Sequence, residues 1–141
     1  MDDTELAAAA LAARERSYAP YSGFTVGAAL LAESGRVYPG CNIENAAWSP
    51  SNCAERTAFF KAVSEGERAF SAIAVAGGRA GKPAEDFCPP CGVCRQVMME
   101  FCDPDSFRIL LVKSAGKPKI LTLRQLLPFG FGARNLEGGS R

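Results

Sequence analysis

Residues 24–43, FTVGAALLAESGRVYPGCNI, decide the fold of this 141-residue chain. The segment opens with an almost unbroken apolar run from Phe24 to Leu31, which is typical of a largely buried strand. Glu33-Ser34-Gly35 then supplies the residue types of a tight turn, and the chain from Arg36 to about Ile43 is expected to return antiparallel. The stretch therefore predicts a β-hairpin whose first strand is buried.

On both sides of this hairpin, helices and strands are expected to alternate. A helix from Glu5 to about Arg16, capped by Asp2 or Asp3, comes before it. After it we expect a helix from Cys53 to Gly66, a strand over 71–76, a loop over 77–90, a helix over 92–102, a strand over 107–112, and a short extended segment over 120–122 that leads into a helix over 123–127. This order predicts an α/β fold with three layers, α/β/α, around a mixed sheet of about five strands. We expect one domain over 1–141, in which 129–141 form a C-terminal tail that contains Gly and Phe.

Charge and composition exclude several classes of function. Sixteen basic residues against fifteen acidic ones give a net charge of +1, so no basic excess is available to bind nucleic acid. No apolar run approaches the roughly 20 residues that span a bilayer, and the acidic start of the chain is unlike a secretory signal. We therefore expect a cytoplasmic protein with no nucleic-acid or membrane partner. The chain also has no histidine, which excludes Ser-His-Asp and Cys-His nucleophiles and any histidine metal site.

Three of the six cysteines lie in the segment CPPCGVC, residues 88–94. Its pair Cys91 and Cys94 is a natural zinc chelate, because one sharp turn brings both sulfurs to the same ion. Cys53 and this pair each stand at the start of a predicted helix, and the positive ends of two adjacent helices would stabilise thiolates. The sequence thus predicts Cys53, Cys91 and Cys94 as ligands of a Zn²⁺ ion with an open fourth position, which is typical of a catalytic site.

Cys88 leaves an alternative open. As a fourth ligand it would close the site, and the protein would then be a structural-zinc interaction module. A thioredoxin-like redox role for Cys91 and Cys94 is a further alternative, but it leaves Cys53 and Glu55 without a role. An iron–sulfur site is disfavoured, because the position where that pattern needs another cysteine is Met98.

Glu55 lies two residues after Cys53 and could serve either of two purposes. In Asn52-Cys53-Ala54-Glu55 its carboxylate could complete a capping box by accepting a backbone N–H. It could instead converge with Cys53 on a ligand beyond the helix end, where a carboxylate can hold a water and move its protons. We favour the catalytic role.

Two segments, CAER at 53–56 and PCGVCR at 90–95, resemble the zinc-dependent cytidine deaminases, in particular the small homotetrameric type with three cysteine ligands. The resemblance extends over nearly the whole chain. Its further motifs are Tyr18–Ser22, the run from Phe24 to Leu30, Gly40–Ala46, Cys53–Thr57, Pro90–Gln96 and Leu126–Pro128.

The resemblance implies hydrolytic deamination of cytidine and deoxycytidine to uridine and deoxyuridine with release of ammonia, a reaction of pyrimidine salvage. It implies Zn²⁺ on the three cysteines and Glu55 as the proton shuttle. It also implies five contacts with the nucleoside, which are Asn42 and Glu44 on the ribose hydroxyls, Phe24 against the nucleoside, the Ala54 backbone on the base, and Phe131 stacked on the base from a neighbouring subunit of a homotetramer.

Two expectations about charge follow from this site. Three thiolates leave a zinc site with a net negative charge, so we expect Arg56 to donate hydrogen bonds to them, with Arg95 as a second possible donor. Glu44 beside the sugar would repel a 3′-phosphate, so CMP and single-stranded DNA are expected to be poor substrates.

The alternative to a cytidine deaminase is an enzyme that deaminates another aminopyrimidine nucleoside, such as blasticidin S.

Overall fold

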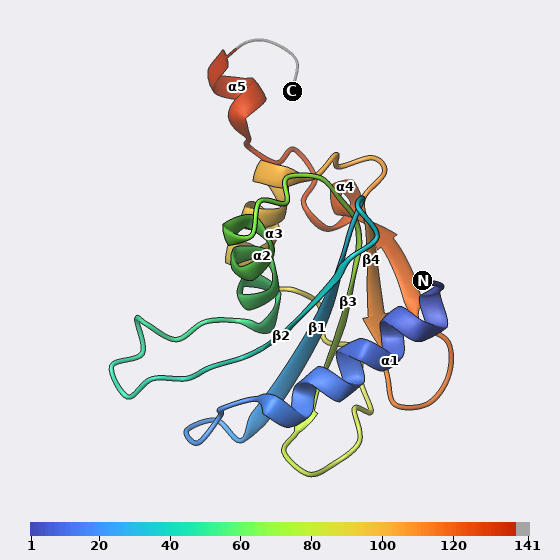
Figure 1. Ribbon diagram of the computed structural model, residues 1–141. Coiled ribbons are helices and arrows are strands. Elements are labelled where there is room, and N and C mark those ends of the chain that lie inside the picture. Colours follow the sequence, from blue (N-terminus) through green and yellow to red (C-terminus); the bar gives the residue numbers. More distant parts are fainter. Residues whose placement is uncertain (138–141) are drawn as a thin grey trace.

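The computed structural model describes residues 1–137, so the last four residues of the expected tail, 138–141, lie outside the described residues. The helices and strands follow the predicted order (Figure 1). They are α1 (Asp3–Ala13), the 3₁₀ turn η1 (Arg14–Arg16), β1 (Phe24–Ala32), β2 (Val37–Cys41), α2 (Ala54–Ser64), β3 (Phe70–Arg79), α3 (Gly92–Phe101), β4 (Arg108–Val112), β5 (Lys119–Thr122), α4 (Leu123–Leu126) and α5 (Ala133–Glu137). The short helix α5 was not predicted.

The strands form one five-stranded mixed sheet in the order β2-β1-β3-β4-β5. β1 pairs antiparallel with both β2 and β3, which confirms the hairpin and places β1 inside the sheet. β3 and β4 are parallel, and β5 closes the far edge antiparallel to β4. The parallel pair is connected through α3, as expected of a crossover between parallel strands.

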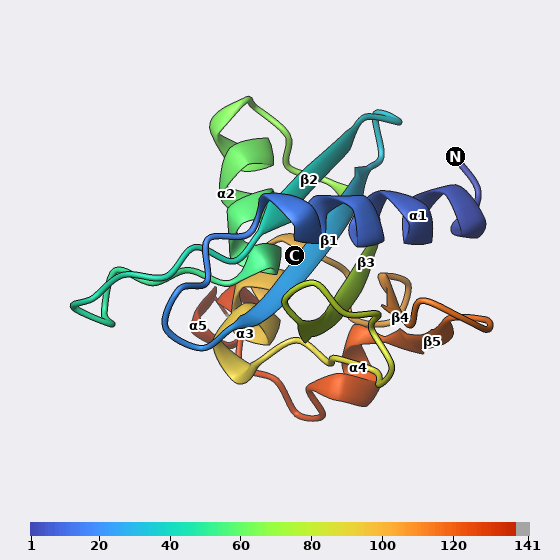
Figure 2. The same ribbon diagram turned by 90° about the horizontal axis from the view of Figure 1, so that it is seen from below.

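Helices cover both faces of this sheet, as the predicted three-layer arrangement requires (Figure 2). On one face α1 packs through Leu6 and Ala10 against small apolar side chains such as Ala29 and Ala74. On the other face α2 and α3 share a core with the alternate residues of the same strands, including Leu30. The α/β/α fold with a mixed five-stranded sheet is therefore confirmed.

Two strand glycines let the helices approach the sheet closely. A Cβ on Gly27 would lie 2.1 Å from the carbonyl oxygen of Ala10 in α1. A Cβ on Gly40 would lie 2.4 Å from the carbonyl oxygen of Ala54 in α2. Since β2 thus touches the first turn of α2, Gly40 sets the position of the helix end that carries Cys53 and Glu55.

The helix ends follow local signals. Asp2 caps α1 and forms a complete capping box with Glu5, in agreement with the predicted cap. α2 ends at Ser64, just before Gly66, whose φ of +102° suits glycine. The first helix does not stay α-helical to Arg16, because the chain tightens into a 3₁₀ turn from Arg14.

Arg14 is buried and connects α1 to the chain beyond β3. Its guanidinium donates to the backbone carbonyls of Thr25, Arg79 and Lys82 and to the hydroxyl of Thr25. These bonds fasten the start of the segment over 80–91, which leads to Cys91. The predicted strand over 71–76 is longer than expected, and β3 continues to Arg79 before this segment begins.

Within residues 1–137, no helix combines the length and the apolar character that crossing a bilayer would require.

Candidate metal centre and active site

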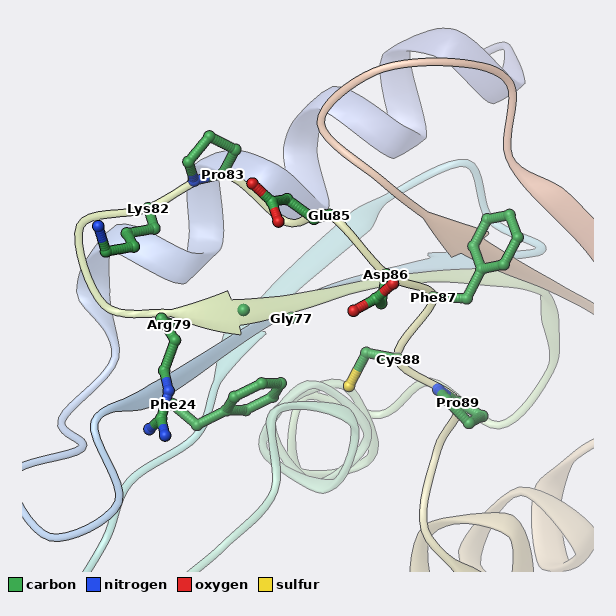
Figure 3. Close-up of a pocket in the computed structure, with 11 residues that line it drawn as sticks. Phe24, Gly77, Arg79, Lys82, Pro83, Glu85, Asp86, Phe87, Cys88 and Pro89 are labelled. Carbon is green, nitrogen blue, oxygen red and sulfur yellow. The ribbon is translucent and has the colours of Figure 1, made fainter.

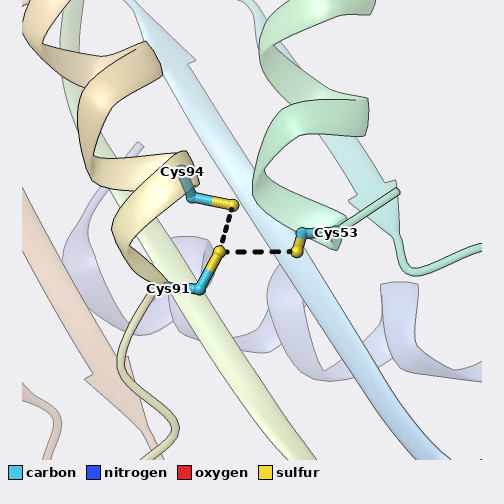
Figure 4. Close-up of side chains that lie close together, drawn as sticks. All are labelled: Cys53, Cys91 and Cys94. Atoms are coloured by element: carbon cyan, nitrogen blue, oxygen red, sulfur yellow. Dashed lines mark hydrogen bonds between the residues drawn. The ribbon is translucent and has the colours of Figure 1, made fainter. Parts of the chain in front are cut away.

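The first turns of α2 and α3 lie side by side, and three cysteines meet there (Figure 4). Cys53 is the N-cap residue of α2, Cys91 is the N-cap residue of α3, and Cys94 lies in the first turn of α3. The Sγ atoms of Cys53 and Cys91 are 3.7 Å apart, and those of Cys91 and Cys94 are 3.5 Å apart. All three sulfurs lie within 4.8 Å of one another.

The sulfur separations fit one Zn²⁺ ion. Zn–S bonds of about 2.3 Å in tetrahedral geometry place two ligand sulfurs about 3.8 Å apart. The separations of Cys53 from Cys91 and of Cys91 from Cys94 lie within a few tenths of an ångström of that value. All six cysteines are free thiols, so no disulfide competes for these three sulfurs. The donor set of three cysteines leaves a fourth position for water or substrate.

Cys88 does not join the cluster. Among the residues that the structure describes, the group that could hold a metal consists of Cys53, Cys91 and Cys94 alone. The Cys88 side chain lies against Gly77 of β3, where a Cβ on the glycine would meet its Sγ at 2.7 Å. The closed site with four cysteines, and with it the structural-zinc module, is wrong.

Arg56 is the cation nearest to the cluster. Its Nη2 donates to Cys53 Sγ at 3.1 Å. Hydrogen bonds from Cys94 and then from Arg56 and Cys91 lower the pKa of Cys53 to about 5, against the opposing effect of burial. In residues 1–137, Arg56 Nε is the sole buried side-chain nitrogen or oxygen without a hydrogen-bond partner. The second expected donor, Arg95, is engaged elsewhere, because its Nε and Nη1 donate to the backbone carbonyls of Pro90 and Leu126.

Glu55 is buried beside the cysteines, with only 4% of its surface exposed. Burial, together with the nearby Cys53, raises the pKa of Glu55 to about 7. The capping-box interpretation is wrong, because α2 starts at Ala54 and Cys53 is its N-cap, with no side-chain cap bond. Glu55 is therefore the second residue of the helix, where a capping box needs the third.

A cavity of about 300 Å³ opens at this helix end. It is lined by Glu55, Cys53 and Cys91 together with the predicted binding residues Asn42, Glu44 and Ala54. Asn42 also braces the neighbouring strand, since its side chain accepts from Val26 N and donates to Phe24 O, both at 2.9 Å. The cavity thus brings together three expected nucleoside contacts, the carboxylate of Glu55, and two of the three cysteines, Cys53 and Cys91.

Phe24 and Phe131 lie outside the lining of this cavity. Phe24 lines an adjoining cavity of about 400 Å³, which shares only Cys88 and Pro89 with the first (Figure 3). Phe131 is 56% exposed, and its backbone carbonyl accepts from Gln96 Nε2 at 2.8 Å. A role for Phe131 in a neighbouring subunit's site stays a prediction.

Sequence reasoning missed the residues that surround Glu44. Tyr21 and Ser22 supply three hydrogen bonds to its carboxylate, and Ser51 lines the same cavity. The motif Tyr18–Ser22 was visible in the sequence, but its spacing from Glu44 gave no sign that the two segments meet.

Comparison with known proteins agrees with this site. The family model described as "Cytidine and deoxycytidylate deaminase zinc-binding region" matches residues 1–108. The chain is 51% identical over 136 residues to a cytidine deaminase of Sporosarcina psychrophila, covering 96% of each, and 48% identical over 136 residues to one of Halalkalibacterium halodurans, covering 96% of this chain and 98% of the relative. The crystal structure of cytidine deaminase from Burkholderia pseudomallei has a TM-score of 0.84 at 45% identity, covering 93% of this chain and 100% of that one. The chain therefore belongs to the cytidine and deoxycytidylate deaminases, a family of zinc-dependent hydrolytic enzymes.

Proposed function

We propose that this enzyme deaminates cytidine and deoxycytidine hydrolytically, giving uridine and deoxyuridine with release of ammonia. The observation that carries the proposal is the buried Glu55 beside three clustered cysteines, in the lining of a cavity of about 300 Å³. Relatives that are named cytidine deaminase over nearly their full length support the same substrate.

Cys53, Cys91 and Cys94 would hold the Zn²⁺ ion. When bound, the ion lowers the pKa of a water in its open position and so supplies a nucleophile near neutral pH. The chain itself offsets the negative charge of the thiolates. Arg56 donates to Cys53, and Cys53 and Cys91 stand as N-cap residues at the positive ends of α2 and α3.

Glu55 would move the protons of the reaction. Its carboxylate takes a proton from the attacking water and gives it to N3 of the cytosine ring, and it then carries a second proton to the departing amine. A pKa of about 7 suits this work, because the group is then available in both protonation states near neutral pH. The low exposure of Glu55 keeps bulk water from competing for these protons.

Asn42 and Glu44 would bind the sugar, the Ala54 backbone would contact the base, and Phe24 would pack against the nucleoside. Asn42, Glu44 and Ala54 line the cavity that Glu55 shares, which supports their roles. The Glu44 carboxylate accepts three hydrogen bonds, which lower its pKa and keep it negative at neutral pH. A negative group at the sugar disfavours a phosphate on the substrate, so a nucleoside is preferred to a nucleotide or a nucleic acid.

A homotetramer is proposed for the assembly, with Phe131 reaching a neighbouring subunit's site. Large apolar side chains that stay exposed on one chain support a contact between copies. Among the exposed large apolar side chains are Phe60, Phe129, Phe131 and Leu136. We place the enzyme in the cytoplasm, where six free cysteines stay reduced, and assign the reaction to pyrimidine salvage.

The test is a comparison of kcat/KM for cytidine, deoxycytidine, CMP and a cytosine-containing single-stranded oligonucleotide. The expected result is turnover of both nucleosides and poor turnover of CMP and the oligonucleotide. Comparable kcat/KM for the oligonucleotide would contradict the proposal. Turnover of blasticidin S without turnover of cytidine would assign the site to another aminopyrimidine nucleoside.

A further inference from the structure

The carboxylate of Glu44 is held by one short turn of the chain. Its Oε1 accepts from the backbone N–H groups of Tyr21 and Ser22 at 3.0 and 3.1 Å. Its Oε2 accepts from the Ser22 hydroxyl at 2.5 Å. All three donors come from two adjacent residues that lie more than twenty positions away in the sequence. The orientation of this carboxylate is therefore determined by the turn before β1, and not by the loop after β2 that carries Glu44.

Ser22 is itself fixed on other sides. Its Oγ accepts from the backbone N–H of Phe24 at 3.0 Å, so the hydroxyl proton remains for Glu44. Its backbone carbonyl accepts from Arg79 Nη1 at 2.9 Å, which connects the turn to the end of β3. The Ser22 hydroxyl thus links the Glu44 carboxylate to the backbone of Phe24 at the start of β1.

The turn is also pinned by a ring contact. The Tyr21 and Trp48 rings lie 5.7 Å apart, which joins the turn to the loop between β2 and α2. Trp48 adopts a φ of +63°, which is uncommon for a residue with a side chain. The contact places two otherwise exposed rings together and leaves the Ser22 hydroxyl aimed at Glu44.

These three hydrogen bonds occupy most of the acceptor positions of the Glu44 carboxylate. A carboxylate has about four lone-pair positions, two on each oxygen. Tyr21 and Ser22 fill both positions on Oε1, and the Ser22 hydroxyl fills one on Oε2. One acceptor position remains, and it lies on Oε2.

We infer that Ser22 is a positioning residue for the sugar, which fixes Glu44 so that its carboxylate accepts one sugar hydroxyl and no more. The inference rests on the proposed function, since it deepens the role of Glu44 in nucleoside binding. Ser22 acts through Glu44 and takes no part in the chemistry at the base. Without its hydroxyl, Oε1 stays held by the two backbone N–H groups, but Oε2 loses its donor, and binding the sugar must then fix the position of that oxygen.

The test compares Ser22→Ala with the matched variant Ser34→Ala. The Ser34 hydroxyl donates to Glu67 Oε2 at 2.6 Å, so the control removes a serine–glutamate bond of similar length, but outside the cavity. Each variant is assayed on cytidine, 2′-deoxycytidine and 3′-deoxycytidine, and Ser22→Thr, which keeps the hydroxyl, serves as the rescue.

With Ser22→Ala, KM for cytidine is expected to rise about tenfold, the effect of one hydrogen bond to a charged group, with kcat little changed. Because Glu44 accepts a single hydroxyl, this rise should vanish for one of the two deoxy analogues and persist for the other. Ser22→Thr should restore the KM of the wild type, and Ser34→Ala should leave KM unchanged for all three substrates.

Three results would overturn the inference. They are an unchanged KM for cytidine in Ser22→Ala, an equal rise on all three substrates, and a rise that vanishes for both analogues. The last result would mean that Glu44 takes both hydroxyls. Failure of the proposed function is distinguishable from these, because it appears as a wild-type enzyme that leaves cytidine unchanged.

Discussion

Replacing Arg56 by Gln removes the cation that contacts the cysteine cluster. Its Nη2 lies 3.1 Å from Cys53 Sγ, and the guanidinium is partly buried, so solvent does not readily replace it. A hydrogen bond to a charged group contributes about 1.5–3 kcal/mol. Because about 1.4 kcal/mol is a factor of ten in an equilibrium constant, Arg56→Gln should weaken zinc binding roughly 10- to 100-fold.

The assay is competition for zinc between the protein and a chelator of known affinity, at fixed pH and salt. Arg36→Gln is the control, since it removes the same charge from an exposed pair with Glu65, whose atoms are 3.3 Å apart. Arg36→Gln should leave zinc affinity unchanged, because exposed charges at a distance are screened. Wild-type zinc affinity and full activity in Arg56→Gln would refute the assignment of Arg56 to the thiolates.

Three further variants test the fold and the open zinc site. Gly40→Ala should lower the free energy of unfolding by about 1–3 kcal/mol in a denaturant titration, because its Cβ would overlap the backbone of α2, whereas Gly92→Ala, whose Cβ meets nothing within 4 Å, should not. Hydroxyl donors, Ser34 foremost, hold the pKa of Glu67 below its usual range, so their stabilising effect is present above its unfolded-state pKa and is lost as the pH falls through the folded-state value. The difference in melting temperature between wild type and Glu67→Gln should therefore shrink on acidification, and a constant difference down to about pH 3 would contradict this. Cys88→Ser should keep both zinc and activity, and loss of zinc would return Cys88 to the ligand set.

The sequence was sufficient for the features that depend on local pattern. The apolar run from Phe24, the turn at Gly35 and the alternation beyond Cys53 predicted the sheet and its layers. The start of α2 and α3 at cysteines also predicted which sulfurs could meet, because helix N-termini on one face of a sheet can lie side by side. The structure places Cys53 and Cys91 as the two N-cap residues.

What the sequence could not predict depends on contacts between distant segments. The exact start of α2 made Glu55 the second residue of the helix, and a shift of one position separates a cap from a buried carboxylate. The place of Cys88 depends on the space above Gly77, eleven positions earlier in the chain. The hydrogen bonds between Ser22 and Glu44 arise only when the turn before β1 folds onto the loop after β2.

The most direct test of the central claim is ammonia release from cytidine by the wild type and by Glu55→Gln, with zinc content measured in both. The account predicts about one zinc per chain in each protein, with activity in the wild type and a loss of at least about 100-fold in the variant, since a positioned acid–base group contributes about 10²–10⁴-fold. Substantial activity in Glu55→Gln with zinc retained would contradict the role of Glu55. A zinc-loaded wild type that releases no ammonia from cytidine would contradict the proposed function itself.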